Sequence, residues 1–207
     1  RTDPGGAGVV AEGQVVLLMP HFSSRPLLRR AVIGGALLGV LLAGGLPVDV
    51  ARAEDTAPEA ALKAAFVFNF TKFVDWPDAD SFGKFSLCTV GGGLTADALG
   101  AFEGKPALGK PIQVLQGPRG AALRSCQLVF ISEAGAGATA DVLNELRNSA
   151  TLTVSDSPNF LDSGGAIALV REGGRLRFEI NLGLAQAKGL KVGAQLLRLA
   201  KSVRESR

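Results

Sequence analysis

Histidine, tyrosine and cysteine are almost missing from this chain of 207 residues. It contains one histidine, two cysteines and no tyrosine. The histidine, His21, lies in an N-terminal stretch that we expect to be removed, so the mature protein would have none. This excludes the common catalytic triads, histidine general bases and most zinc sites. The cysteines are far apart and form no Cys-x-x-Cys motif, which disfavours thiol-redox catalysis. We therefore expect no enzyme, catalytic residue, cofactor or metal.

A large charge imbalance is also missing from the part of the chain that should fold. The net charge is +3 and the sequence pI is about 9.1. Five of the 22 basic side chains and three of the 19 acidic ones lie in residues 1–53, so the remainder is nearly neutral. The basic excess therefore does not indicate a nucleic-acid-binding surface.

The N-terminal region has the pattern of an export signal. After Met19, the only methionine, come three arginines and an apolar run at 31–46. The run is short for a membrane span, and Ala51-Arg52-Ala53 fits the small-x-small pattern of signal peptidase sites. We predict a cleaved signal peptide from Met19 to Ala53, upstream residues 1–18 without function, and a folded domain at 54–207. Periplasmic localisation follows, and an uncleaved anchor is the alternative.

Export changes the interpretation of the two cysteines. Cys88 and Cys126 both lie in the mature part, and an oxidising compartment allows them to form a disulfide. The alternative is two buried free thiols in neighbouring strands. We favour the disulfide.

The first mature segment predicts an aromatic helix. Leu62, Phe66, Phe70 and Phe73 recur at helical spacing, and Pro77 should end the helix. We expect these four side chains to pack on a sheet.

Strands and helices then alternate along the chain. We predict helices at 94–105, 138–149 and 184–188, and amphipathic periodicity continues through the C-terminal stretch 191–206. Strands are predicted at 84–92, 110–116, 126–132 and 151–156, followed by a hairpin at 166–182 with its turn at 172–174. This alternation predicts a single three-layer α/β domain. Its mixed, mostly parallel sheet carries a C-terminal β-hairpin and flanking helices.

Two patterns resemble binding or catalytic sites only weakly. Gly91-Gly92-Gly93 joins a strand to a helix, where phosphates often bind, but it lacks the rest of a P-loop or dinucleotide motif. Asp156 and Asp162 flank a loop and resemble an acid/base pair, although nothing in the sequence brings them together. We interpret both patterns as structural.

Several segments together resemble the YfiR/HmsC-like periplasmic family. They include "KAAFVFNFTKFVDWP", "FSLCTVG", "CQLVFIS", "TLTVSDSPNF" and "GGAIALVREGGRLRFEINLGLAQAKGLKV", in the family's order. The resemblance implies a periplasmic repressor that binds the sensor domain of a membrane diguanylate cyclase, lowering cyclic-di-GMP and biofilm formation. It also implies a homodimer, with no nucleic acid bound and no membrane insertion after signal cleavage. Cys88 and Cys126 occupy positions where such members carry a disulfide. The alternative function is a periplasmic small-ligand-binding or sensor module.

The aromatic segment holds the residues that we single out for structure and contact. We predict structural roles for five residues: Asn69, Trp76, Pro77, Glu179 and Asn181. If Asn69 is buried it must find hydrogen-bond partners, and Glu179 and Asn181 are possible ones. Phe68 points away from the predicted stripe. We therefore expect Val67 and Phe68 to be exposed and to contact a partner or a second copy.

Overall fold

The computed structural model describes residues 56–205. The predicted upstream stretch, signal peptide and domain boundary at residue 54 lie outside these residues. Within 56–205, no helix is long and apolar enough to cross a membrane.

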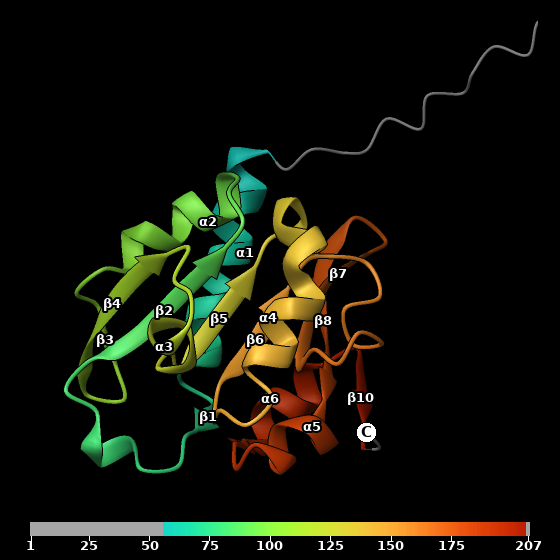
Figure 1. Cartoon of the computed structure of the whole chain (residues 1–207). Coiled ribbons are helices and arrows are strands. Elements are labelled where there is room, and N and C mark those ends of the chain that lie inside the picture. The colour runs from blue at the N-terminus through green and yellow to red at the C-terminus, as the bar shows by residue number, and fades with distance from the viewer. Residues whose placement is uncertain (1–55, 206–207) are drawn as a thin grey trace, which may run out of the picture. The chain divides into compact units, whose positions relative to one another are not determined.

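One mixed sheet organises the domain, in the strand order β10-β8-β7-β6-β5-β2-β4-β3 (Figure 1). Adjacent strands in the run β4-β2-β5-β6-β7 are parallel, and so are β8 and β10. The pairs β7–β8 and β3–β4 are antiparallel. The strands are β2 (Phe85–Val90), β3 (Pro106–Ala107), β4 (Lys110–Gln116), β5 (Leu128–Ile131), β6 (Leu152–Ser155), β7 (Ile167–Glu172), β8 (Arg175–Asn181) and β10 (Ser202–Arg204). A separate antiparallel pair joins β1 (Val74–Asp75) to β9 (Lys191–Val192).

Helices cover both faces of this sheet (Figure 1). On one face lie α1 (Ala57–Phe70) and α2 (Leu94–Leu99); on the other lie α3 (Ala121–Arg124) and α4 (Thr139–Glu145). The last two helices, α5 (Leu182–Ala187) and α6 (Ala194–Leu199), follow the hairpin. The parallel part has the strand order of a doubly wound fold, with its reversal between β2 and β5. The predicted three-layer α/β class is confirmed.

The predicted aromatic stripe packs on the sheet through Phe66, Phe70 and Phe73, but not through Leu62. Pro58 near its first turn suits a helix start, because proline there costs no hydrogen bond. The buried row is Ala60, Ala64, Val67 and Phe70, each at most 1% exposed. Leu62 is 47% exposed, so its predicted place in the core is wrong. The inward face of α1 therefore combines small alanines with Val67 and Phe70.

The sheet separates two hydrophobic clusters. The larger cluster lies under α1 and α2 and is rich in aromatic rings, with Phe70 and Phe66 edge-on to Phe178. The smaller cluster lies under α3 and α4 and contains both cysteines, with Leu123 and Leu146 from the helical side. The strands alternate between the two clusters, as a pleated strand must when both faces are covered.

The predicted hairpin is confirmed. The amphipathic stripe predicted through 191–206 is met only in part, because Leu196 is buried and Val192 half-buried but the helix does not continue to residue 206. Gly173 and Gly174 both have positive φ at the β7–β8 turn, which favours glycine there. Further on, α6 ends at Leu199, and the Lys201 amide donates to the carbonyl of Phe178, so the chain continues as strand β10. Pairing with the open side of β8 outweighs the helical periodicity. Leu199 and Val203 are therefore exposed, at 56% and 37%.

Candidate functional site

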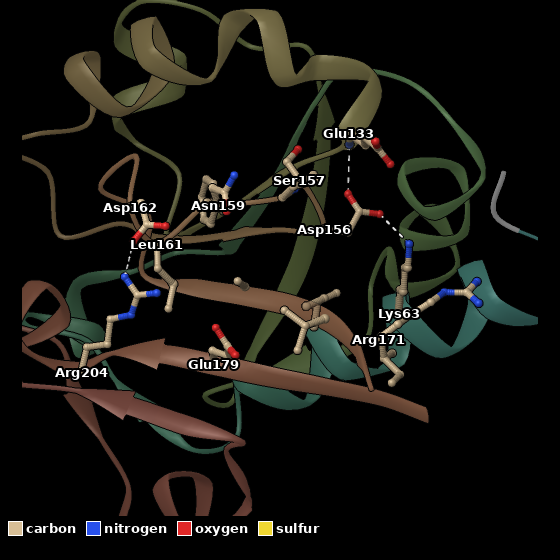
Figure 2. A pocket seen from close by; sticks show the side chains of 16 residues that line it. Lys63, Glu133, Asp156, Ser157, Asn159, Leu161, Asp162, Arg171, Glu179 and Arg204 are labelled. Atoms are coloured by element: carbon tan, nitrogen blue, oxygen red, sulfur yellow. Dashed lines mark hydrogen bonds and ion pairs between the residues drawn. The ribbon is translucent and has the colours of Figure 1, made fainter. Parts of the chain in front are cut away.

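A pocket of about 420 Å³ lies beside β7 and β8. Figure 2 shows the loop after β6 above it and strands β7 and β8 below. Apolar side chains such as Leu161 and Val170 line part of it. Its charged lining residues are Lys63, Glu133, Asp156, Asp162, Arg171, Glu179 and Arg204.

The roof of the pocket is fixed by hydrogen bonds at the end of β6. The Ser155 hydroxyl donates to the Ile131 carbonyl at 2.6 Å, and the Ser157 amide donates to the Ser155 hydroxyl at 3.0 Å. Further along, a Cβ atom at Gly165 would lie 2.1 Å from the ring of Phe160, so only glycine lets this ring pack against the loop. The loop is therefore held in place before any ligand arrives.

A buried ion pair forms one wall of the pocket. Lys63 of α1 reaches the Asp156 carboxylate at 2.8 Å, and the two side chains are only 9% and 6% exposed. The other carboxylate oxygen of Asp156 accepts the Glu133 amide hydrogen at 2.9 Å. Both oxygens of this buried carboxylate thus have donors, as burial of a charge requires.

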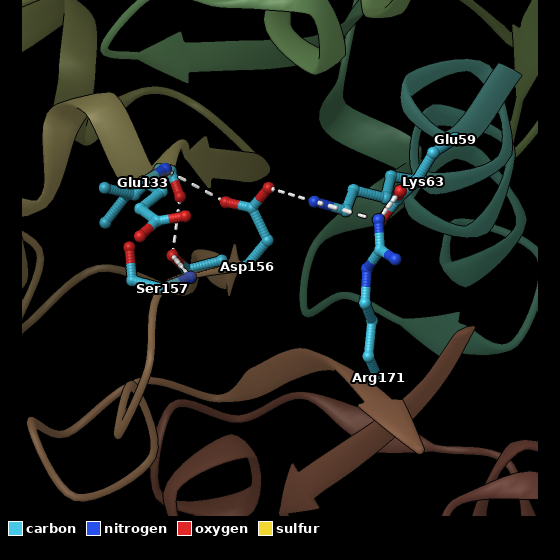
Figure 3. A network of polar contacts seen from close by, with 8 residues as sticks. Glu59, Lys63, Glu133, Asp156, Ser157 and Arg171 are labelled. Carbon is cyan, nitrogen blue, oxygen red and sulfur yellow. Dashed lines mark hydrogen bonds and ion pairs between the residues drawn. The ribbon is translucent and has the colours of Figure 1, made fainter. Parts of the chain in front are cut away.

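The same network extends to β7 (Figure 3). The Lys63 ammonium lies 3.8 Å from Glu59, one helical turn earlier, and Glu59 is ion-paired with Arg171. Helix α1 is thereby tied to β6 through Asp156 and to β7 through Arg171. The sequence signal for this network is a lysine on the buried stripe of α1, and the predictions made from sequence missed it.

Carboxylates also pair with the basic groups at the opposite end of the pocket. Arg204 of β10 lies 2.5 Å from Asp162, and this contact raises the pKa of the Arg204 guanidinium. Lys201 lies 3.1 Å from Glu179 and 3.5 Å from Glu172, and these carboxylates raise the pKa of its ammonium. The charges around the pocket therefore balance one another locally.

The pocket chemistry suits binding better than acid/base catalysis. Asp156 and Asp162 both line it, but each carboxylate is held in an ion pair with a basic side chain. Within residues 56–205, no three His, Cys, Asp or Glu side chains are grouped closely enough to hold a metal ion. Ser157 is one of the lining residues, and its hydroxyl oxygen is buried and makes no hydrogen bond to any residue that the structure describes.

The glycine-rich turn at 91–93 is packed against the neighbouring loop. A Cβ atom at Gly91 would lie 2.4 Å from the Ser132 hydroxyl and 2.6 Å from the Gly135 amide nitrogen. A Cβ atom at Gly135 would lie 2.8 Å from the Val90 carbonyl oxygen. The two glycines thus allow two loops to touch at the point where the strand order reverses. Their role is close backbone packing.

The predicted disulfide is present. Cys88 in β2 is bonded to Cys126, two residues before β5, with a Cα–Cα distance of 6.0 Å. Both residues are at most 2% exposed. The bond closes the segment that contains β4 and α3 and ties it to a central strand.

Of the two contact residues predicted on the aromatic helix, one is corrected and the other stays a prediction. Val67 is fully buried against the sheet, because it belongs to the inward row of α1, so it is not an exposed contact. Phe68 is only partly accessible: its ring stacks on Phe102 at 4.4 Å, with the Lys72 ammonium 4.8 Å from the ring centre. A partner contact through Phe68 stays a prediction.

The remaining residues that we singled out lie in separate places. Trp76 is buried, and its indole N–H donates to the Gln127 carbonyl at 2.9 Å. Asn69 is exposed, so the burial that would have required partners such as Glu179 or Asn181 does not occur. The Asn181 side chain instead caps α5 by accepting the Leu184 amide hydrogen.

Pro77 is exposed and does not end α1. The helix already stops at Phe70, and the Thr71 hydroxyl donates to the Phe68 carbonyl at 2.7 Å. The chain then forms β1, so part of the segment between the helix and the proline is a strand that pairs with β9.

Two solved structures resemble the domain weakly. One is the ABC domain in complex with L-Trp from Streptococcus pneumonia, with a TM-score of 0.48, and the other a conserved domain protein from Vibrio cholerae O1 biovar El Tor, with a TM-score of 0.46. Each is 12% identical, and each alignment covers 70% of this chain and 60% of the other. Similarity at this level carries no functional information. No curated protein matches the chain.

A family model gives the decisive comparison. The YfiR/HmsC-like model matches residues 60–201, which run from the first turns of α1 to the residue before β10. The match covers more than half of the chain and includes the aromatic helix, both cysteines and the hairpin. The chain belongs to the YfiR/HmsC-like family.

Proposed function

We propose that this protein is a periplasmic repressor that binds the sensor domain of an inner-membrane diguanylate cyclase. It would thereby lower cyclic-di-GMP synthesis and biofilm formation. The observation that carries the proposal is the family match over residues 60–201. A regulatory, non-catalytic role suits this family, and the predicted export signal suits a partner with a periplasmic domain. The homodimer implied by the resemblance is part of the proposal.

The face formed by α1 and α2 is our candidate for the cyclase contact. Leu62 on α1 and Leu94 on α2 are each 47% exposed, and the partly accessible Phe68 and Phe102 rings belong to the same layer. Large apolar side chains in solvent are the usual anchors of protein interfaces. Because both leucines are exposed, replacing them should leave the fold intact.

Capture from membranes tests the proposal. The tagged protein should enrich a protein that carries a diguanylate cyclase domain and a periplasmic domain. Leu62→Glu should reduce the capture at least ~10-fold, as expected for a central interface residue. Ala140→Glu is the matched control, because it adds the same charge to an exposed position of α4 on the other face. Failure to enrich a cyclase that is detected in the input would overturn the proposal.

A small-ligand sensor is the second candidate, and the pocket favours it. The pocket has an apolar part, balanced charges and polar lining residues such as Ser157, a combination typical of small-molecule sites. Thermal-shift screening with amino acids and nucleotides tests this function. A true ligand at 100 times its Kd adds about 2.7 kcal/mol to the free energy of unfolding. Ser157→Ala should weaken that shift, and the absence of any shift across both ligand classes would count against a sensor.

A further inference from the structure

The charged side chains of the pocket lie at different depths. Four carboxylates and three basic groups line it, so acidic groups are in excess. The two arginines among them, Arg171 and Arg204, are 53% and 43% exposed. Arg171 is ion-paired with Glu59 and Arg204 with Asp162. These basic groups therefore belong to the rim of the pocket, and each already has a carboxylate partner.

The interior of the pocket holds two carboxylates and one basic group. Asp156 is 6% exposed, Glu179 is 18% exposed and Lys63 is 9% exposed. Lys63 and Asp156 neutralise each other at 2.8 Å. Glu179 is paired with Lys201, which is 34% exposed and is not one of the lining residues. The counter-charge of Lys63 thus lies inside the pocket, whereas that of Glu179 lies outside it.

Strand pairing places Glu179 beside the apolar floor of the pocket. Glu179 of β8 is directly opposite Ala168 of β7, so the two side chains share one face of the sheet. Val170 lies two residues along β7 on the same face, and both apolar residues line the pocket. Figure 2 shows Glu179 on the strands below the loop after β6, from which Leu161 contributes to the lining. The interior therefore combines a carboxylate with apolar surface from the floor and from the loop.

We propose that the pocket binds a small primary amine. The ammonium group pairs with Glu179, and the apolar body lies between Leu161 and Val170. The inference rests on the ligand-sensor function, the second candidate above, and names its ligand class. A carboxylate that is little exposed attracts a cation more strongly than one in bulk water, because solvent screens the pair less. The volume of about 420 Å³ is within the usual range of small-molecule sites.

The same arrangement disfavours anionic ligands. An anion in the interior would have to displace Asp156 from Lys63, and it would lie near the carboxylate of Glu179. Breaking a buried ion pair is costly, because it leaves one charge without its partner. Nucleotides should therefore bind more weakly than amines. The carboxylate of an amino acid should likewise lower its affinity below that of the amine with the same side chain.

Three probes with the same aromatic ring and different charged groups test the ligand class. They are phenethylamine, phenylalanine and 3-phenylpropionate, which carry a cation, both charges and an anion. The melting temperature of the purified protein, measured over a concentration series, gives the Kd of each. Phenethylamine should bind at least ~10-fold more tightly than the other two, because a carboxylate on the ligand is repelled by Glu179. Methylamine, which has the charge without the ring, should bind at least ~10-fold more weakly than phenethylamine, because it buries little apolar surface.

A pair of glutamine variants tests the site. Glu179→Gln keeps the shape of the side chain and removes its charge, so it should weaken phenethylamine binding at least ~10-fold. Glu172→Gln is the matched control. It removes the other carboxylate partner of Lys201, at 3.5 Å, but Glu172 is 51% exposed and is not a lining residue. Its affinity for phenethylamine should equal that of the wild type, and the melting temperatures without ligand show that both variants fold.

The outcomes separate the ligand class from the sensor function. Phenylalanine or 3-phenylpropionate binding as tightly as phenethylamine would overturn the amine class and leave the sensor function standing. So would a nucleotide that shifts the melting temperature when phenethylamine does not. Equal affinities in Glu179→Gln and Glu172→Gln would overturn the site. The absence of a shift with every amine, amino acid and nucleotide would overturn both the inference and the sensor function, and cyclase capture would still test the repressor role.

Discussion

The two faces of the sheet are stabilised in different ways. The α1 and α2 face has a long helix of 14 residues and a cluster rich in aromatic rings, without a covalent link. The α3 and α4 face has helices of 4 and 7 residues and a smaller cluster that includes the disulfide. Short helices bury little apolar area and are marginal by themselves. The comparison indicates that the α1 and α2 face depends on apolar packing, whereas the α3 and α4 face also depends on the disulfide.

The largest loss of stability is expected when a buried ring is removed from the α1 and α2 face. Phe70 is 1% exposed and contacts Phe66 and Phe178 edge-on. Phe70→Ala should lower the free energy of unfolding by about 3–5 kcal/mol, through lost transfer energy and the cavity that remains. Leu62→Ala on the same helix should cost less than about 0.5 kcal/mol, because its side chain is exposed. Urea unfolding monitored by circular dichroism measures both. Equal losses would contradict the assignment of the buried stripe.

The next effect comes from removing the covalent link on the other face. The Cys88→Ala/Cys126→Ala double variant should lower the free energy of unfolding by about 2–4 kcal/mol, since the bond closes a loop of 38 residues. The reducing agent dithiothreitol, added to unfolded wild type before refolding, should reproduce the loss. A variant as stable as the wild type would show that packing alone holds α3 and α4.

A smaller effect is expected from the ion pair that links α1 to the end of β6. Asp156→Asn leaves the buried Lys63 ammonium without its closest carboxylate and should cost about 2 kcal/mol. This is below the usual 3–5 kcal/mol for breaking a buried pair, because Glu59 remains 3.8 Å from Lys63. Removing the lysine charge as well, as in Lys63→Met/Asp156→Asn, should restore much of the loss, because asparagine still accepts the Glu133 amide hydrogen. A double variant less stable than Asp156→Asn would contradict this explanation.

The smallest effect concerns Lys188, which links α5 to the end of α4. Its ammonium donates to the carbonyl oxygens of Leu146 and Ser149, and burial lowers its pKa. Lys188→Met should cost about 1 kcal/mol, from lost hydrogen bonds to a half-exposed charge.

The lowered pKa of Lys188 also predicts a pH dependence. In the window between its folded pKa and 10.5, the unfolded state binds more protons, so stability should rise with pH. Lys201 acts in the opposite direction: its raised pKa gives stability that is present below 10.5 and lost as the pH rises through its folded pKa. In Lys188→Met, the rise in stability with pH should therefore be missing when unfolding is measured from pH 8 upward. An unchanged profile would contradict the burial of this group.

Sequence patterns predicted the central strands well, because buried strands have a strong local signal. The apolar run at 126–132 and the alternating segment at 175–181 became β5 and β8. The C-terminal strand could not be predicted, because its helical periodicity is local whereas its pairing with β8 is a long-range contact. The α1 stripe was predicted correctly at Phe66, Phe70 and Phe73 but not at Leu62, where the inward positions are taken by Ala60 and Ala64.

The pocket was the least predictable part. Lys63, Asp156, Arg171 and Arg204 come from four separate elements, and each is an ordinary charged residue in its local sequence. Only the strand order brings them to the same pocket. The disulfide was easier to predict, because the chain contains a single pair of cysteines and an export signal is expected.

The level of cyclic-di-GMP in cells tests the central claim most directly. Deleting the gene should raise that level, and supplying the wild-type protein should restore it. The rise should disappear when the captured cyclase is deleted as well, because the repressor acts only through that enzyme. An unchanged level in the single deletion, with the cyclase present in the membrane, would contradict the repressor function.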